Sequence, residues 1–161
     1  MAHTVPDQAI SLRVTREMPA GAEEVFAAYT EPEAQRLWLT QLGPDEGEVR
    51  TTVDLRVGGV WEATFRPNPA VLVHDIFTFV EIDRPRRVVT RYTGESTVDG
   101  RVTASPETLI ALTFTPTDAG TLITVEQTGF PDTQTRDFFE TVAWPGGLDR
   151  IAAYLAGRRS A

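Results

Sequence analysis

The stretch DLRVGGVWEATF, residues 54–65, carries the pattern that decides the fold. It is typical of two β-strands meeting at Gly58-Gly59, since a glycine pair supplies the positive φ of a tight turn. Apolar side chains alternate along the second strand and so share one face: Trp61, Ala63 and Phe65. A glycine pair can also cradle a phosphate, but neither a lysine nor a helix follows, so we interpret Gly58 and Gly59 as a structural turn.

Strands dominate the chain on both sides of this turn. The pattern predicts them near 48–56, 59–66, 71–82, 86–93, 107–116 and 121–128, with turn-forming residues between them. The longest connection, GESTVDGRVTASP at 94–106, is either a loop or an extension of its two strands. Consecutive strands with short connections predict an antiparallel sheet.

Helical spacing appears before and after these strands. Residues 10–18 alternate like a half-buried strand, and 21–30 and 33–42 then place apolar residues at helical intervals. The helical pattern returns over 131–159, where Pro145-Gly146-Gly147 predicts a kink or a break. So few helices can cover only one face of a sheet, which predicts an α+β fold. We expect one domain over 10–159, after a loose arm at 1–9.

Charge and composition exclude several partners. The 161 residues have a net charge of −8, which argues against nucleic acids and against anionic membrane surfaces. No apolar run approaches the roughly 18 residues of a membrane span, and the first residues lack the pattern of a secretion signal. The expected location is the cytoplasm.

Two residue types are absent, and each absence closes a class of chemistry. Without cysteine there are no disulfides, thiolate nucleophiles or thiolate metal ligands. All 15 basic residues are arginine, so no lysine can form a Schiff base or anchor a cofactor. The only imidazoles are His3, in the loose arm, and His74, and no metal-binding motif is present. We expect no metal and no cofactor.

Five stretches, taken in their order, point to a known family. They are VTREMPAGAEEVFAAYTEPEAQRLW, DLRVGGVW, FTFVEIDRPRRVVTRY, LTFTPTDAGTLITVEQTGF and WPGGLDRIAAYL. Together they resemble the START-like (SRPBCC) helix-grip superfamily, and within it the group similar to the C-terminal domain of the activator of Hsp90 ATPase (AHSA1-like). This resemblance spans about residues 10 to 157. It implies a curved sheet of six or seven strands around a long C-terminal helix, with an apolar cavity between them.

Aromatic residues are the main candidates for lining that cavity. We expect these to face inward: Trp38, Trp61, Phe65, Phe77, Phe79, Phe114, Phe130, Phe139 and Trp144. Each one alone fits a packed core, whereas the set also fits a ligand pocket with a few polar groups. Indole N–H and tyrosine hydroxyl groups would then orient the ligand.

Two polar residues, His74 and Arg91, are expected to join this cavity. By parity with Leu72, His74 faces inward, and Asp75 beside it faces the opposite way, so the two cannot form a dyad. Arg91 and Arg56 lie near the aromatic set. Either one forms a salt bridge with Glu62 or Glu81, or it binds an acidic group of the ligand.

Three functions remain open, and none of the motifs is a catalytic signature. The leading hypothesis is the binding of a small apolar or amphipathic molecule between the sheet and the C-terminal helix. The second, implied by the resemblance, is an interaction module for a chaperone. The third is a cyclase- or hydrolase-like enzyme in which His74, Arg91 or Glu62 moves protons. The protein is expected to be a monomer or a homodimer.

Overall fold

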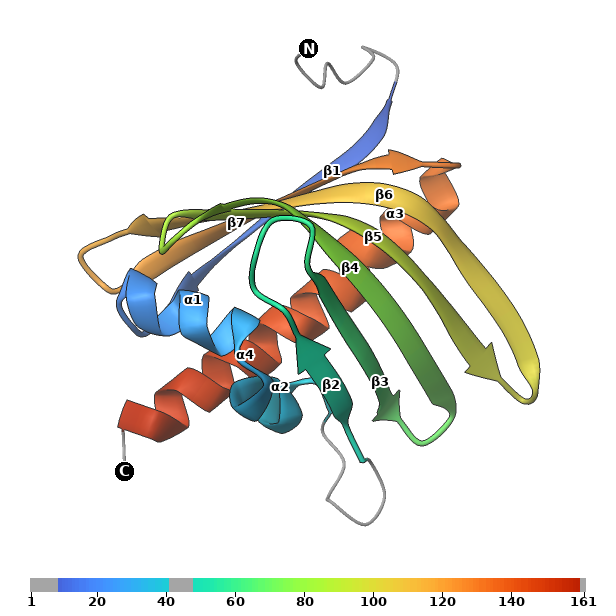
Figure 1. The fold of residues 1–161 in the computed structure, drawn as a ribbon, viewed down its shortest axis with the longest axis horizontal. Coiled ribbons are helices and arrows are strands. Elements are labelled where there is room, and N and C mark those ends of the chain that lie inside the picture. The colour runs from blue at the N-terminus through green and yellow to red at the C-terminus, as the bar shows by residue number, and fades with distance from the viewer. Residues whose placement is uncertain (1–8, 41–47, 160–161) are drawn as a thin grey trace.

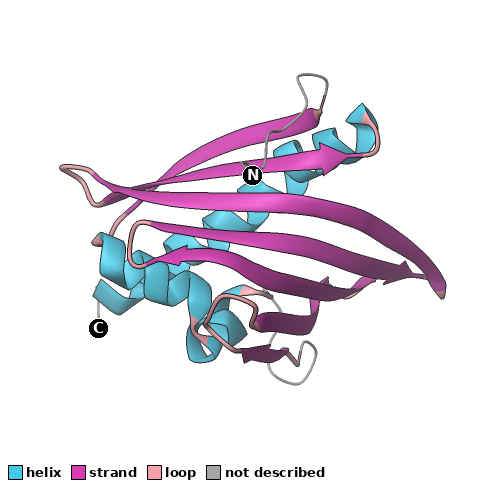
Figure 2. Ribbon diagram, turned by 45° about the horizontal axis from the view of Figure 1, so that its top comes forward, coloured by secondary structure: helices cyan, strands magenta, loops and turns pink. Residues whose placement is uncertain are grey.

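The computed structural model describes residues 9–40 and 48–159, and it places all helices on one face of a curved sheet (Figures 1 and 2). Apart from Ala9, the expected N-terminal arm lies outside the described residues. The elements are β1 (Ile10–Met18), α1 (Ala22–Thr30), α2 (Pro32–Trp38), β2 (Arg50–Val53), β3 (Val60–Asn68), β4 (Val71–Asp83), β5 (Arg87–Val98), β6 (Arg101–Pro116), β7 (Thr121–Phe130), α3 (Thr133–Phe138), a π-helical turn η1 (Phe139–Ala143) and α4 (Trp144–Arg159).

The seven strands form one antiparallel sheet in the order β1-β7-β6-β5-β4-β3-β2. From β2 to β7, strands that are consecutive in the sequence are neighbours in the sheet, and β1 pairs with β7. The long C-terminal helical segment crosses the concave face (Figure 1). The predicted α+β class and the helix-grip arrangement are therefore confirmed.

The alternation of side chains builds the core. Inward-facing residues of β6 and β7, such as Leu112 and Ile123, belong to one buried cluster with residues of α4, and both are almost inaccessible to solvent. The helix contributes Leu148, Ile151 and Leu155. Each buried aliphatic side chain of this kind is worth about 1.5–3 kcal/mol relative to an exposed one. This packing fixes α4 against the sheet.

Residues 94–106 extend the two strands that they connect. They continue β5 and β6 to a tight turn at Asp99 and Gly100, whose φ angles are 52° and 76°. Positive φ at both central residues suits the right-handed twist of a hairpin. The result is a long hairpin that projects beyond the rest of the sheet (Figure 1).

The glycine pair just before β3 forms a structural turn. Gly58 has a φ of 86°, and a Cβ on Gly59 would overlap the carbonyl oxygen of Asp54. The turn also docks on β4, because Gly58 N donates to Phe79 O at 2.8 Å and Phe79 N donates to Gly59 O at 2.9 Å. The strand predicted over 48–56, before this turn, is too long, since β2 covers only Arg50–Val53.

The irregularity expected at Pro145-Gly146-Gly147 falls one turn earlier. Pro145 has no N–H to donate to the preceding turn, and the chain widens into η1 just before it. There the Trp144 N–H donates to the Phe139 carbonyl, five residues back. The helix then continues without a break. In the part of the chain that the structure describes, no helix is both long and apolar enough to cross a membrane.

Candidate functional site

A carboxyl group, Asp75, lies on the mainly apolar inner face of the sheet. The pairing places Asp75 of β4 between Ala63 of β3 and Gly94 of β5. Because side chains alternate along a strand, Asp75 shares its face with the buried Phe77 and Phe79. A polar group in this position requires a partner.

That partner is Tyr92 of β5, whose hydroxyl donates to Asp75 Oδ1 at 2.7 Å. Burial raises the pKa of Asp75 to about 7, although the bond from Tyr92 and the nearby charge of His74 lower it. Burial first, and then the negative charge of Asp75, raise the pKa values of Tyr92 and Tyr29. Both phenols therefore stay protonated at neutral pH, while Asp75 is close to half ionised.

Gly94 provides the space for this pair. A Cβ at position 94 would lie 2.6 Å from Asp75 Oδ1 and closer still to the Tyr92 hydroxyl. Atoms that are not bonded to each other do not approach so closely, so a side chain here would push the two groups apart. The absent side chain of Gly94 is therefore part of the site.

Aromatic rings surround the Tyr92–Asp75 pair. The Phe77 ring stacks on Trp61 with centroids 4.1 Å apart and meets the Tyr92 ring at 5.0 Å. Phe139 of η1 contacts Tyr92 from the helical side at 6.1 Å, and Tyr29 of α1 meets the edge of Trp61 at 5.3 Å. Tyr92 therefore belongs to a continuous set of contacting rings, which we call the aromatic wall: Tyr29, Trp61, Phe77, Tyr92 and Phe139.

The site is also accessible. Asp75 is half-buried, which is enough to raise the pKa of its carboxyl group, and part of the residue remains open to solvent. Other inner-face residues of β4 and β5, Val73 and Ser96, are half-buried too, as are Phe139 and Trp144 of the helical segment. Intermediate burial leaves each of these residues partly open to solvent. We use the name recess for the space that they would border if a small molecule binds beside Asp75.

The aromatic residues expected to line the cavity all lie on the helix side of the sheet, within or packed against one core. Phe77 and Phe139 contact Tyr92, and Trp61 stacks on Phe77. Phe79 and Phe114 lie in the same core with Phe26, 5.5 Å from Phe114. The remaining members are Trp38, Phe65, Phe130 and Trp144, which are buried or packed against the core.

The indole N–H groups do not point to a ligand, contrary to expectation. Trp38 Nε1 donates to Ala28 O at 2.7 Å, and Trp61 Nε1 donates to Thr51 Oγ1 at 2.9 Å. Trp144 Nε1 donates to Gln127 Oε1 at 2.8 Å. Buried donors need partners in the apo protein as well, which the sequence pattern alone does not reveal.

His74 and Arg91 lie on the outer face of the sheet, so the expectation that they line the cavity is corrected. His74 Nε2 is 2.7 Å from Glu62 Oε2, and Arg91 is exposed. Up to Phe79, the residues that share the inner face of β4 are the odd-numbered ones, which Leu72 does not join. The suggested partners of Arg56 and Arg91 change too: Arg56 pairs with Asp54 at 2.8 Å, and Glu81 accepts from Arg87 at 3.1 Å.

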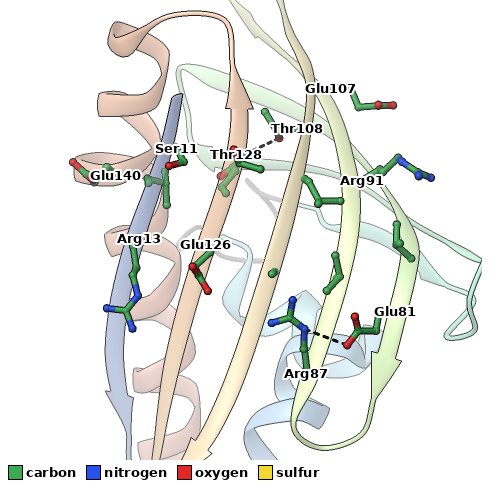
Figure 3. Close-up of a pocket in the computed structure, with 16 residues that line it drawn as sticks. Ser11, Arg13, Glu81, Arg87, Arg91, Glu107, Thr108, Glu126, Thr128 and Glu140 are labelled. Atoms are coloured by element: carbon green, nitrogen blue, oxygen red, sulfur yellow. Dashed lines mark hydrogen bonds and ion pairs between the residues drawn. The ribbon is translucent and has the colours of Figure 1, made fainter. Parts of the chain in front are cut away.

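Arg91 instead borders a groove of about 980 Å³ on the outer face (Figure 3). Its floor includes Val89, Leu109 and Ala111. Charges of both signs surround the floor: Arg13, Glu81, Arg87, Arg91, Glu107, Glu126 and Glu140. With three arginines and four glutamates around it, the groove has no single sign of charge. Among the described residues, no cluster of three acidic or histidine side chains could hold a metal ion.

Tyr92→Phe is expected to raise the pKa of Asp75 above about 7, because it removes the hydroxyl that lowers it. An NMR titration of the Asp75 carboxyl carbon measures this value directly. Tyr154→Phe removes a hydroxyl that instead accepts from Arg158, and it should leave the titration unchanged. A value that stays the same or falls in Tyr92→Phe would contradict the assigned role of the hydroxyl.

The chain matches the family model described as Activator of Hsp90 ATPase homolog 1-like protein over residues 19–156. The chain belongs to this family. The match covers both helices after β1, the sheet from β2 onward and almost all of α4. The Activator of Hsp90 ATPase homolog 1-like assignment confirms the resemblance seen in the sequence, and no curated protein matches the chain.

Solved structures share the fold of this family member at low identity. Protein NE0264 from Nitrosomonas europaea is 19% identical, with a TM-score of 0.71, covering 98% of this chain and all of its own. Protein Ms6760 from Mycobacterium smegmatis is 20% identical, with a TM-score of 0.71 over 90% of each chain. CalU16 from Micromonospora echinospora is 21% identical, with a TM-score of 0.63 over 92% of this chain and 76% of its own. These similarities show the fold alone, so function must be argued from the site.

Proposed function

We propose that this protein binds a small apolar or amphipathic molecule in the recess between β3–β5 and the C-terminal helical segment. The observation that carries the proposal is the Tyr92–Asp75 pair, an accessible polar group set in an aromatic wall. Apolar surroundings with a few placed polar groups are the usual composition of small-molecule sites. A core that served stability alone would be better filled by an apolar residue at position 75.

The two parts of the site have different roles in binding. Apolar contact with Phe77, Phe139 and their neighbours supplies the affinity, at about 25 cal/mol per Å² of buried surface before ordering costs are subtracted. The Tyr92–Asp75 pair orients the ligand, because its hydrogen bonds have fixed directions. The family fold is consistent with this role.

Val73→Phe is expected to weaken ligand binding at least about tenfold, which corresponds to roughly 1.4 kcal/mol. Val73 lies on the inner face, two residues from Asp75, and is half-buried, so a larger ring there occupies the recess without removing the polar pair. Titration with the neutral apolar dye Nile red, followed by its fluorescence, measures the change. Any molecule that co-purifies can be identified by native mass spectrometry and used in the same assay.

The matched control is Leu72→Phe, which makes the same addition one residue away on the outer face. It should bind the dye as the wild type does. Equal binding by Val73→Phe and the wild type, in folded protein, would place the ligand elsewhere and contradict the proposed site.

A second candidate function, acid–base catalysis in the same recess, is favoured by the pKa of Asp75. A carboxyl group with a pKa of about 7 can both accept and donate protons at neutral pH. In this function Asp75 replaces the residues considered from the sequence, because His74 and Glu62 face outward. If a reaction is detected in a substrate panel, Asp75→Asn should abolish it, and retained turnover would eliminate this function.

The chaperone-linked alternative is supported by the family description alone. It predicts that a chaperone is recovered in a low-salt pull-down even when Val73→Phe has filled the recess. Recovery of no chaperone would count against it.

A further inference from the structure

Asp75 lacks a positive partner. No ion pair to this carboxylate occurs among residues 9–40 and 48–159, and Tyr92 is the one hydrogen-bond donor found for it there. The nearest cationic influence is that of His74, which points to the opposite face and contacts Glu62. One oxygen of the carboxyl group, Oδ1, accepts from Tyr92, and within the described residues no donor is found for the other, Oδ2.

The described residues offer no countercharge to Asp75. Every basic side chain is an arginine apart from His3 and His74, and the segments 1–8, 41–47 and 160–161 contain no arginine. The partly buried Arg150 of α4 donates instead to the Trp38 carbonyl, at 2.7 Å. Arg16 pairs with Asp149 of α4. The cations nearest to the interior thus have other partners.

The rings beside Asp75 suit a cation. The faces of Trp, Tyr and Phe carry partial negative charge and attract ammonium groups placed over them within about 6 Å. Phe77, Tyr92 and Phe139 form a chain of contacting rings at the carboxyl group, with centroid distances of 5.0 and 6.1 Å. A carboxylate among such rings is the combination that recognises an amine with an apolar body.

We infer that the ligand of this recess carries a protonated amine, which binds to Asp75 among the rings of Phe77, Tyr92 and Phe139. The inference rests on the proposed function, since it names the class of molecule that the same site takes. The ammonium group supplies the missing countercharge, and the apolar remainder of the ligand lies against the aromatic wall. Binding is non-covalent and needs no further reactant.

The test compares two probes with the same apolar body, 4-phenylbutylamine and 4-phenylbutan-1-ol, by calorimetric titration at pH 8. The wild type should bind the amine at least about tenfold more tightly than the alcohol, because hydrogen bonds to charged groups are stronger than neutral ones. Asp75→Asn keeps the size of the side chain but not its charge, and it should remove the preference. Glu95→Gln removes one negative charge from the outer face of the neighbouring strand and should keep it.

The pH dependence provides a second readout. Asp75 has a pKa of about 7, while an alkylamine stays protonated to about pH 10, so amine affinity should rise about tenfold from pH 6 to pH 8. The other titratable groups around Asp75 are Tyr92, Tyr29 and His74. The two tyrosines do not ionise in this range, and His74→Gln should retain the rise.

The outcomes separate the two proposals. A preference for the alcohol, equal binding of both probes, or an amine preference that survives Asp75→Asn would overturn the inference and leave the binding function intact. Tighter alcohol binding at pH 6 than at pH 8 would show that protonated Asp75 serves neutral ligands instead. Failure of both probes and of Nile red to bind would overturn both proposals.

Discussion

At pH 8, Asp75→Asn is expected to be more stable than the wild type by on the order of 3 kcal/mol. The wild-type protein holds an ionised carboxylate in an enclosed apolar environment with one hydrogen bond from Tyr92. The amide of asparagine has a similar shape, accepts the same bond and carries no charge. Substitutions of functional residues that increase stability are typical of sites that bind ligands or catalyse reactions.

The sign of this effect reverses the usual behaviour of an aspartate. The pKa of Asp75 is about 7 in the folded protein against an ordinary value of 3.8, so the folded state holds the proton more tightly. The contribution of Asp75 to stability therefore falls as pH rises from about 4 to about 7 and is constant above that range. The advantage of the variant should grow through the same window.

Urea unfolding at pH 4.5, 6, 7 and 8, followed by tryptophan fluorescence, measures the difference. Glu95→Gln is the control, since Glu95 is exposed on the outer face and its removal should change stability little at any of these pH values. A destabilised Asp75→Asn, or an advantage that does not vary with pH, would show that Asp75 is not enclosed as described.

Trp61→Ala is expected to destabilise the protein by about 4 kcal/mol, within the range of large core truncations. Trp61 is 2% exposed, stacks on Phe77 and meets the edge of Tyr29. Its N–H also donates to Thr51 Oγ1, which in turn donates to Gln35 Oε1 at 2.6 Å. The truncation removes both the ring contacts and the end of this buried chain.

Trp61→Phe separates these two contributions. It keeps an aromatic ring against Phe77 and removes only the N–H donor and part of the volume, so the expected loss is roughly 1–2 kcal/mol. Equilibrium denaturation of the two variants, followed by circular dichroism, gives both values. Similar losses in the two variants would mean that the hydrogen bond, rather than the ring packing, holds β2 and α2 in place.

Much of the fold could be predicted because its signals are local. The alternation at Trp61, Ala63 and Phe65 and the turn chemistry of Gly58-Gly59 identify a β-hairpin-like entry to β3. The sequence leaves residues 94–106 ambiguous, since most of their side chains are exposed on a projecting hairpin and form no apolar pattern. The turn at Asp99-Gly100 was their one local signal.

The site was harder to predict because it depends on which face each strand residue occupies. The run Val71 to Val73 is apolar at every position, so parity counted from Leu72 carries no information about the inner face. Parity counted from Phe77 and Phe79 would have turned Asp75 inward and His74 outward. The signal for the inner face of β4 is therefore carried by Phe77 and Phe79.

The hydrogen bonds of the site cannot be predicted from the residue pattern of any one strand. The bond from Tyr92 to Asp75 depends on the register of β4 with β5, and the indole partners come from residues 10 to 17 positions away in the chain. Such pairs require the three-dimensional structure. Sequence patterns predict the aromatic residues of the site, whereas the bond from Tyr92 to Asp75 follows from the strand register.

The missing side chain at position 94 has a consequence for tracing this site through evolution. Any relative with a larger residue there cannot keep both the carboxyl group and the phenol in these positions, so the identities at 75, 92 and 94 should change together. Aspartate, tyrosine and glycine at those three positions thus form a compact signature. This signature would divide the family into members that have the polar pair and members in which other side chains occupy the same space.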